Sequence, residues 1–220
     1  MTKSTEKGVR GYLAIIGDIH RSRETTNRAR LQKQVETGLQ KANALLEGKL
    51  ASRFVITLGD EFQGLLAAPE SAMEALISLE AVMSGIEIRY GLGWGRLDTA
   101  LRRDAIGMDG PCFHAARNAL VSGKKLDRWV TVSGWSPERD EVLNGIFSLM
   151  GAVRAGWTPT QAATVALMRK AATQVEVAER RKVAVSAVNK ALKGALYRPM
   201  IEAEHAVERI LAWPASEKRV

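Results

Sequence analysis

The chain has 220 residues, of which 46% are hydrophobic and 25% charged, a composition typical of a globular protein that buries a core. The single cysteine, Cys112, excludes an intramolecular disulfide framework and fits a reducing compartment. No N-terminal apolar stretch follows a basic region, and the longest apolar runs are far shorter than the ~20 residues that cross a bilayer. We therefore expect a cytoplasmic protein that has no membrane partner.

The net charge of +8 is unevenly distributed along the chain. Residues 156–220 carry 11 Lys and Arg against 6 Asp and Glu, a surplus of five, whereas residues 1–155 carry 21 against 18, a surplus of three. The denser positive charge of the C-terminal part favours a polyanionic partner there. A solvated basic surface is the alternative.

In chain order, a polar tail at residues 1–10, which we expect to be disordered, precedes a series of alternating elements. Short β-rich apolar runs predict the strands Tyr12–Gly17, Arg53–Leu58, Phe62–Ala67, Ile86–Trp94 and Trp129–Ser133. Helical spacing and start signals predict the helices Glu24–Leu46, Pro69–Met83, Phe113–Val121 and Pro137–Val153. Between the fourth strand and the third helix lies an irregular, Gly-rich loop.

This order of elements is typical of an α+β sandwich of the ferredoxin-like kind, with helices on one face of a mostly antiparallel sheet. The stretch Gly156–Thr160 is a boundary signal, and beyond it the pattern is all helical. We therefore predict an α+β domain over residues 11–155 and a small all-α domain over residues 156–220.

Two acids lie at the ends of apolar runs: Asp18 follows the first strand, and Asp60 lies at the apex of the hairpin that Gly59 and Glu61 complete. Because the first strand lies beside a hairpin strand in such a sheet, we expect the carboxylates of Asp18 and Asp60 to face each other. Two close carboxylates repel unless a cation screens them, and Mg²⁺ (or Mn²⁺) prefers such oxygen ligands. The alternative is that both acids form turns or caps.

Four stretches follow one another in the order and rough spacing of the class III nucleotidyl cyclase domain: GYLAIIGDIH, VITLGDEFQGLL, IRYGLGWGRLDT and GPCFHAARNAL…WVTVS. The residues Leu58–Phe62 also differ by one from the GGDEF signature of the diguanylate cyclases. The chain as a whole resembles the SatD family, whose members pair such a domain with a helix-turn-helix. The resemblance spans most of residues 11–215.

The resemblance implies roles for individual residues. Asp18 and Asp60 match the metal ligands, and with Arg117, which would stabilise charge during phosphoryl transfer, they match the catalytic set. The implied nucleotide-binding residues are Ile19, through its carbonyl, and Arg21, Arg23 and Glu61. Two departures stand out: Ile56 replaces the base-reading lysine of the cyclases, and their late phosphate-binding lysine has no clear match, because Lys124 and Lys125 precede the last strand.

Two further features have structural interpretations. We interpret the glycines Gly91, Gly93 and Gly95 as bulges or close packing rather than as a phosphate cradle. We interpret Cys112 as a small packing residue.

The stretch Trp157–Ala195 resembles the helix-turn-helix of many bacterial regulators. It predicts helices at Pro159–Ala171, Gln174–Arg181 and Ala184–Ala195, with a core of Val175, Ala178, Val183, Val188 and Leu192. Lys182 stands where a turn glycine is usual, and Arg181 replaces a core leucine; both add charge that suits phosphate contact. A final amphipathic helix, Tyr197–Trp213, is predicted either to dock on the first domain or to form a dimer seam.

The outward positions of the third helix predict contact with double-stranded DNA. These positions are Val185, Ser186, Asn189, Lys190 and Lys193. Asparagine and serine bind base edges, and lysines bind phosphate. A three-helix structural or dimerisation module is the alternative.

Three functions fit these patterns. The first is a DNA-binding regulator whose cyclase-like domain senses a nucleotide with Mg²⁺. The second is an active nucleotidyl cyclase or another metal-dependent phosphoryl-transfer enzyme. The third is a degenerate cyclase-like scaffold for dimerisation. The resemblance implies a homodimer in all three cases.

Overall fold

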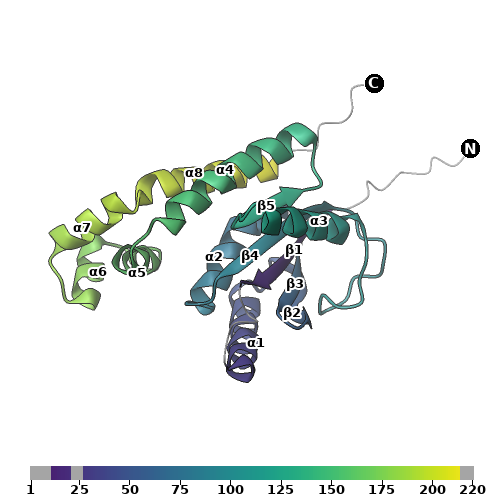
Figure 1. Ribbon diagram of the computed structural model, residues 1–220, viewed down its shortest axis with the longest axis horizontal. Coiled ribbons are helices and arrows are strands. Elements are labelled where there is room, and N and C mark those ends of the chain that lie inside the picture. Colours follow the sequence, from purple (N-terminus) through teal and green to yellow (C-terminus); the bar gives the residue numbers. More distant parts are fainter. Residues whose placement is uncertain (1–10, 21–26, 214–220) are drawn as a thin grey trace, which may run out of the picture.

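The computed structural model describes residues 11–20 and 27–213 (Figure 1). The strands are β1 (Tyr12–Ile19), β2 (Leu50–Leu58), β3 (Glu61–Leu66), β4 (Ile88–Gly95) and β5 (Val130–Ser133). The helices are α1 (Arg28–Leu45), α2 (Ala72–Val82), which follows the short 3-10 helix η2 (Pro69–Ser71), α3 (Pro111–Lys125), α4 (Pro137–Ala155), α5 (Pro159–Met168), α6 (Gln174–Arg181), α7 (Val185–Gly194) and α8 (Tyr197–Ala212). Every predicted strand and helix is present, α6 with the predicted bounds and the others with at least one end shifted; the predicted tail and residues 24–26 lie outside the described residues.

Strand β1 is the centre of a five-stranded sheet with the order β2-β3-β1-β4-β5. It pairs antiparallel with β3 and with β4, and β2 pairs antiparallel with β3. Strand β5 joins β4 in parallel. The sheet is therefore mixed but mostly antiparallel, and the prediction of an α+β fold is confirmed.

The helices cover both faces of this sheet, so the predicted one-sided arrangement is wrong (Figure 1). Residues from Leu13 to Ile19 are buried without interruption, which requires a cover on each side of the pleat. On one face, Leu13 and Ile15 pack in a cluster with α1 and α2. On the other face, Ala14 and Ile16 pack in a cluster with α3.

Helix α3 lies close against β4 because that strand presents glycines to it. A Cβ atom at Gly91 would overlap the carbonyl oxygen of Ala116, and one at Gly93 would overlap backbone atoms of Ala116 and Cys112. The interpretation of these glycines as close packing is confirmed. Cys112 is fully buried at this contact, and burial raises the pKa of its thiol to about 11, as expected for a packing residue.

Helix α1 is amphipathic and begins at a side-chain cap. The side chain of Asn27 accepts a hydrogen bond from the backbone N–H of Arg30 at 2.9 Å, and the buried face of the helix carries Val35, Leu39 and Ala42. Across the described part of the chain, no helix combines the length and apolarity that a membrane span requires.

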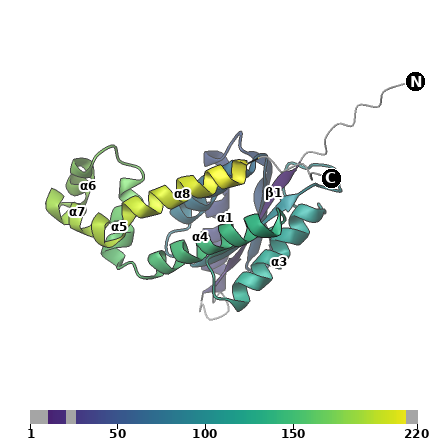
Figure 2. The ribbon, with the colours of Figure 1, turned by 90° about the horizontal axis from the view of Figure 1, so that it is seen from above.

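The C-terminal helices extend from one end of the sheet, and α8 turns back along α4 (Figure 2). Helices α5, α6 and α7 share a small core, whereas α8 places Met200, Val207 and Leu211 in the large core of the sheet domain. Helix α8 thus docks on the first domain, which is one of the two alternatives that the sequence left open. The predicted second domain, residues 156–220, includes α8, but α8 packs in the large core of the sheet domain. The domain boundary at residue 156 therefore stays a prediction.

The core of α5–α7 differs in part from the predicted helix-turn-helix core. Ala178, Val188 and Leu192 are buried as expected, but Val175 is 53% exposed and Val183 is 39% exposed. Val165 from α5 and Val177 from α6 fill the core instead, because α6 is rotated so that the face with Val177 and Ala178 is turned inward.

The turn between α6 and α7 carries the two unusual residues of the sequence. Lys182 adopts a left-handed conformation with φ 54°, as the comparison with a turn glycine implies. The guanidinium of Arg181 donates to the hydroxyl of Thr164 in α5 and is half-buried, so it points inward. Its contact with phosphate stays a prediction, and the structure gives this guanidinium a partner within the helices.

Candidate functional site

A row of charged side chains crosses the sheet on the face that α3 covers. Asp18 of β1 is directly opposite Glu61 of β3 and directly opposite Arg89 of β4. Residues opposite each other in antiparallel strands point to the same face. The register of the sheet therefore places these three side chains side by side, and we call Glu61, Asp18 and Arg89 the charged row.

Helix α3 places two cations over the acidic part of this row. The Nζ atom of Lys124 lies 2.6 Å from Oδ1 of Asp18 and 3.6 Å from Oε1 of Glu61. The guanidinium of Arg117 forms an ion pair with the other carboxylate oxygen of Glu61. Arg89 pairs with Asp127, just beyond the end of α3. Every charge in the row thus has a partner of opposite sign.

Burial sets the electrostatics of Asp18. Its side chain is largely buried, and loss of solvent raises the pKa of its carboxyl above the usual value of 3.8. The hydrogen bond and charge of Lys124 lower this pKa, while the nearby Asp60 and Glu61 carboxylates raise it. The net result is a raised pKa, so the surroundings disfavour the ionised carboxylate. A cation close to Asp18 stabilises this ionised form.

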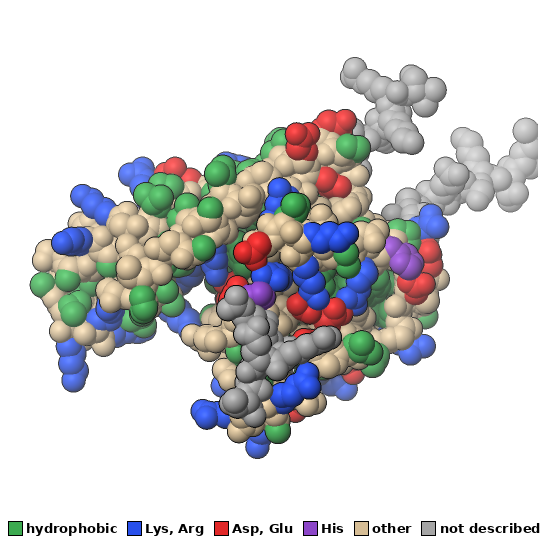
Figure 3. Space-filling model, viewed as in Figure 1, with side chains coloured by type: hydrophobic (Ala, Val, Ile, Leu, Met, Phe, Trp, Pro, Cys, Tyr) green, Lys and Arg blue, Asp and Glu red, His purple; other side chains and the backbone are tan. Residues whose placement is uncertain are grey.

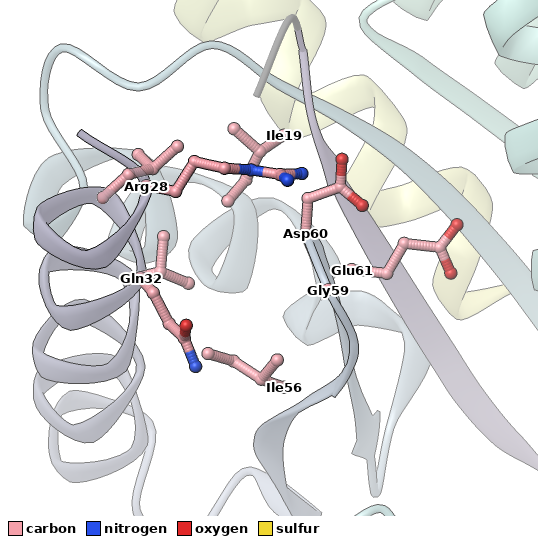
Figure 4. Close-up of a pocket in the computed structure, with 9 residues that line it drawn as sticks. Ile19, Arg28, Gln32, Ile56, Gly59, Asp60 and Glu61 are labelled. Atoms are coloured by element: carbon pink, nitrogen blue, oxygen red, sulfur yellow. The ribbon is translucent and has the colours of Figure 1, made fainter. Parts of the chain in front are cut away.

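Asp60 lies at the same end of the sheet as the charged row, beside the pocket that α1 lines. The hairpin turn is formed by Gly59, with φ 60°, and the carbonyl of Asp60 accepts the N–H of Ile19 at 3.2 Å. Asp60 belongs to this turn, whereas Glu61 is the first residue of β3. In Figure 4 the carboxylates of Asp60 and Glu61 point in different directions, and the guanidinium of Arg28 points toward Asp60.

A pocket of about 320 Å³ lies between α1 and the hairpin (Figure 4). Its lining residues are Ile19, Arg28, Leu31, Gln32, Val35, Ile56, Gly59, Asp60 and Glu61. The lining is apolar toward the sheet and polar at the hairpin turn. Glu61 lines this pocket and also belongs to the charged row, so the two features adjoin at the hairpin.

The structure brings together some of the predicted site residues and separates others. Asp18, Glu61 and Arg117 meet in the charged row, whereas Asp60 and Ile19 line the pocket on the α1 side. Arg21 and Arg23, predicted to bind nucleotide, lie outside the described residues.

Besides Arg89, Lys124 is a residue of this site to which the sequence prediction gave no role. It is seven residues after Arg117, which is two helical turns and hence the same helix face. The predicted helix ended at Val121, but α3 continues to Lys125. A longer helix would have placed both cations on one face.

The oxygen atoms of the row can be compared with the ligands that a divalent cation needs. Within residues 11–20 and 27–213, no group of three or more His, Cys, Asp and Glu side chains is arranged to hold a metal. Asp18 and Glu61 nevertheless converge on a single ammonium group. Two converging carboxylates fit Mg²⁺, which often takes its remaining ligands from substrate phosphates and water.

The predicted DNA-binding residues lie together on the outer face of α7. Val185, Ser186, Asn189, Lys190 and Lys193 are all exposed. Four of these residues, all but Val185, also line an open groove of about 910 Å³ that extends to Thr160 and Gln161 at the start of α5. The face is thus accessible and basic.

Comparisons with solved structures find nucleotidyl cyclase domains at low similarity. A bacterial light-regulated adenylyl cyclase matches with 12% identity and a TM-score of 0.42, over 57% of this chain and 43% of that one. The guanylyl cyclase Cya2 matches with 14% identity and a TM-score of 0.39, over 51% and 70%. A dimeric guanylyl cyclase domain from the aquatic fungus Blastocladiella emersonii matches with 15% identity and a TM-score of 0.38, over 51% and 74%.

This chain spans less than half of the first of these structures. A search of curated proteins finds no match. The model of the SatD family matches residues 12–207, which is most of the chain. The protein therefore belongs to the SatD family.

Proposed function

We propose that this protein is a DNA-binding regulator whose sheet domain binds a nucleotide together with Mg²⁺ or Mn²⁺. The observation that carries the nucleotide part is the charged row, in which two carboxylates share one ammonium under a helix that bears cations. Proteins commonly hold Mg²⁺ with one or two carboxylates and the phosphates of the substrate, without an all-protein cage. A metal that arrives with a polyphosphate therefore suits this row.

The metal ligands in this proposal are Asp18 and Glu61, which converge on one ammonium, with Asp60 of the neighbouring hairpin turn as a further carboxylate. When bound, the ion would neutralise phosphate charge. Arg117 projects from α3 beside Glu61, where its planar guanidinium suits phosphate oxygens. The pocket between α1 and the hairpin adjoins this place and has apolar walls that suit the flat face of a base.

Thermal stability in the presence of nucleotides tests the sensor. We expect ATP, GTP, CTP or UTP to raise the melting temperature only when Mg²⁺ or Mn²⁺ is present. A ligand at 100 times its Kd stabilises the folded state by ~2.7 kcal/mol, so the shift should be measurable. Asp18→Asn should abolish the shift, whereas Glu74→Gln, at an exposed ion pair far from the row, should keep it. The absence of a shift with every nucleotide would contradict the proposal.

The DNA part of the proposal depends on α7. Its exposed Ser186, Asn189, Lys190 and Lys193 suit contact with base edges and phosphates, and the buried core beneath them would hold the helix in place. Fluorescence anisotropy with a labelled duplex tests this part over a series of salt concentrations. We expect log affinity to fall linearly with log salt. Binding that does not change with salt, or no binding to any duplex, would contradict it.

Catalysis is a second candidate, favoured by the two cations that one face of α3 holds over an acidic pair. In this case Asp18 and Asp60 would hold the metal, and Arg117 would stabilise the charge that develops at phosphate. The test is incubation with each nucleoside triphosphate and Mn²⁺, followed by chromatography. Turnover that disappears in Asp60→Ala would support it, and no turnover would leave the sensor as the better proposal.

A homodimer belongs to both candidates as an expectation. Sedimentation velocity of the full chain, with and without nucleotide and Mg²⁺, measures it directly. A monomer at all concentrations would contradict the expected homodimer but would leave the proposed ligand site within the single chain unaffected.

A further inference from the structure

Lys124 has an unusual position within the charged row. Its ammonium is within ion-pair distance of both Asp18 and Glu61, at 2.6 and 3.6 Å. In the part of the chain that the structure describes, no other ion pair joins one cation to two acids. The ammonium therefore occupies the place where the two carboxylates converge.

The other cations at the row do not pair with Asp18. Arg117 pairs with the second oxygen of Glu61, and Arg89 pairs with Asp127. Removal of the Lys124 ammonium would thus leave Asp18, which is largely buried, facing Glu61 and Asp60 without the cation it now has. Like charges held close in a desolvated place repel strongly, so this arrangement needs some cation.

Lys124 is also free to leave. It is the penultimate residue of α3, and its side chain remains 35% exposed. A lysine ammonium is a compact charge on a flexible four-carbon stem, and solvent can accept it at low cost. The same charge would strongly oppose a divalent ion placed next to it.

We propose that Lys124 is an internal competitor for the divalent cation: its ammonium occupies the position between Asp18 and Glu61, and the metal binds only when Lys124 is displaced. This inference rests on the proposed function, because it concerns the metal named there. It adds a regulatory property, namely that the fold without metal is held by its own cation. Whatever pulls Lys124 away then favours metal binding.

Titration with Mn²⁺ alone tests the competition by calorimetry and thermal shift. The proteins are the wild type, Lys124→Met, which keeps the apolar stem and removes the charge, and Lys125→Met, which removes an exposed charge one residue away. We expect Lys124→Met to bind Mn²⁺ at least about tenfold more tightly than the wild type, a difference of ~1.4 kcal/mol. Lys125→Met should bind like the wild type.

A second measurement needs no substitution at the site. Labelling of the wild type with an amine-reactive reagent, read by mass spectrometry, should increase at Lys124 when Mn²⁺ is added and stay constant at Lys125. If Lys124→Met fails to fold by circular dichroism, Lys124→Gln and this labelling experiment replace it. Labelling of Lys124 that is unchanged by saturating Mn²⁺ overturns the proposal.

The outcomes separate this inference from the function on which it rests. Equal or weaker Mn²⁺ binding by Lys124→Met, with binding by the wild type, overturns only the role of Lys124. Binding by Lys124→Met alone supports the competition and shows that the wild-type chain is not a metal sensor by itself. No binding of Mn²⁺ alone by any variant overturns the competition, whereas the proposed function is overturned only if nucleotide and Mn²⁺ together also give no thermal shift.

Discussion

The charged row at the end of the sheet and the outer face of α7 both carry lysines, but in opposite electrostatic situations. In the row, cations and acids from β1, β3, β4 and α3 satisfy one another. On α7, none of the ion pairs that the described residues form involves Lys190 or Lys193. Figure 3 shows red and blue side chains mingled over the sheet end, whereas blue side chains stand apart at the end with α6 and α7.

This difference shows why charge alone does not identify a binding site. A ligand at the row must replace existing ion pairs, so its affinity is a difference between two large terms. A polyanion at α7 displaces only water and counterions, so its affinity should depend steeply on salt. Under the proposed function, the first surface would bind a metal together with a nucleotide, and the second would bind a long polyanion.

The largest effect should come from forcing α3 away from the sheet, because α3 supplies the two cations that pair with the acids of the row. A valine at Gly93 would place Cβ inside the backbone of Ala116, so Gly93→Val should cost at least ~4 kcal/mol of unfolding free energy. Urea denaturation measures it. Gly145→Val in α4 is the matched control, since no atom lies within 4 Å of its Cβ position. Similar losses in both variants would contradict close packing of α3 on β4.

A smaller loss should follow from breaking the link between α5 and α8. Glu204 is 5% exposed and pairs through both oxygens with Arg169, at the end of α5. Removing one partner of such a pair leaves the other charge uncompensated, so Glu204→Gln should cost ~3 kcal/mol in urea denaturation.

The control for this prediction is Glu202→Gln on the same helix. Glu202 pairs with Arg198 at the exposed surface, 3.2 Å apart, and its loss should cost less than ~0.5 kcal/mol. Equal losses of unfolding free energy in the two variants would mean that Glu204 does not anchor α5–α7 to α8.

A change confined to salt dependence should follow from removing one cation of α7. If the face binds duplex DNA, Lys190→Gln should reduce the slope of log affinity against log salt by ~0.9, because one phosphate contact is lost. Lys33→Gln, at an exposed position on α1, should leave the slope unchanged. A slope equally reduced by both substitutions would indicate diffuse attraction without a defined face.

The sequence predicted the elements of the fold well but not their layering. Short apolar runs located all five strands, and α3 was shortened because its C-terminal turn is charged. The uninterrupted apolar run Leu13–Ile16 of β1 and the glycines of β4 were the signals for a helix on each face. They were visible in the sequence, yet the ferredoxin-like interpretation placed all helices on one side.

The candidate site was predictable only in part, because it depends on register. Asp18 and Asp60 were expected to face each other, but the register places Glu61 opposite Asp18, and Asp60 lines the pocket beside α1. Whether Asp60 or Glu61 shares the face of Asp18 follows from a pairing shift of a single residue, which no local pattern fixes. The structure pairs Asp18 with Glu61, and Lys124 enters the site only because α3 is one turn longer than expected.

The smallest effect should be a pH dependence that measures whether burial or Lys124 dominates at Asp18. Burial raises the pKa of this carboxyl above 3.8, so its contribution to stability is present below that pH and is lost as pH rises through the raised pKa. The melting temperature of the wild type minus that of Asp18→Asn should therefore fall from pH 4 upward and then level off. In a chain of this size, each ~1 kcal/mol of such a change shifts the melting temperature by about 3 °C. Gly145→Val, which changes no titratable group, should give a constant difference from the wild type. If the difference between the wild type and Asp18→Asn instead rises with pH, the Lys124 ion pair outweighs burial, and Lys124 is held too tightly to yield its place to a metal.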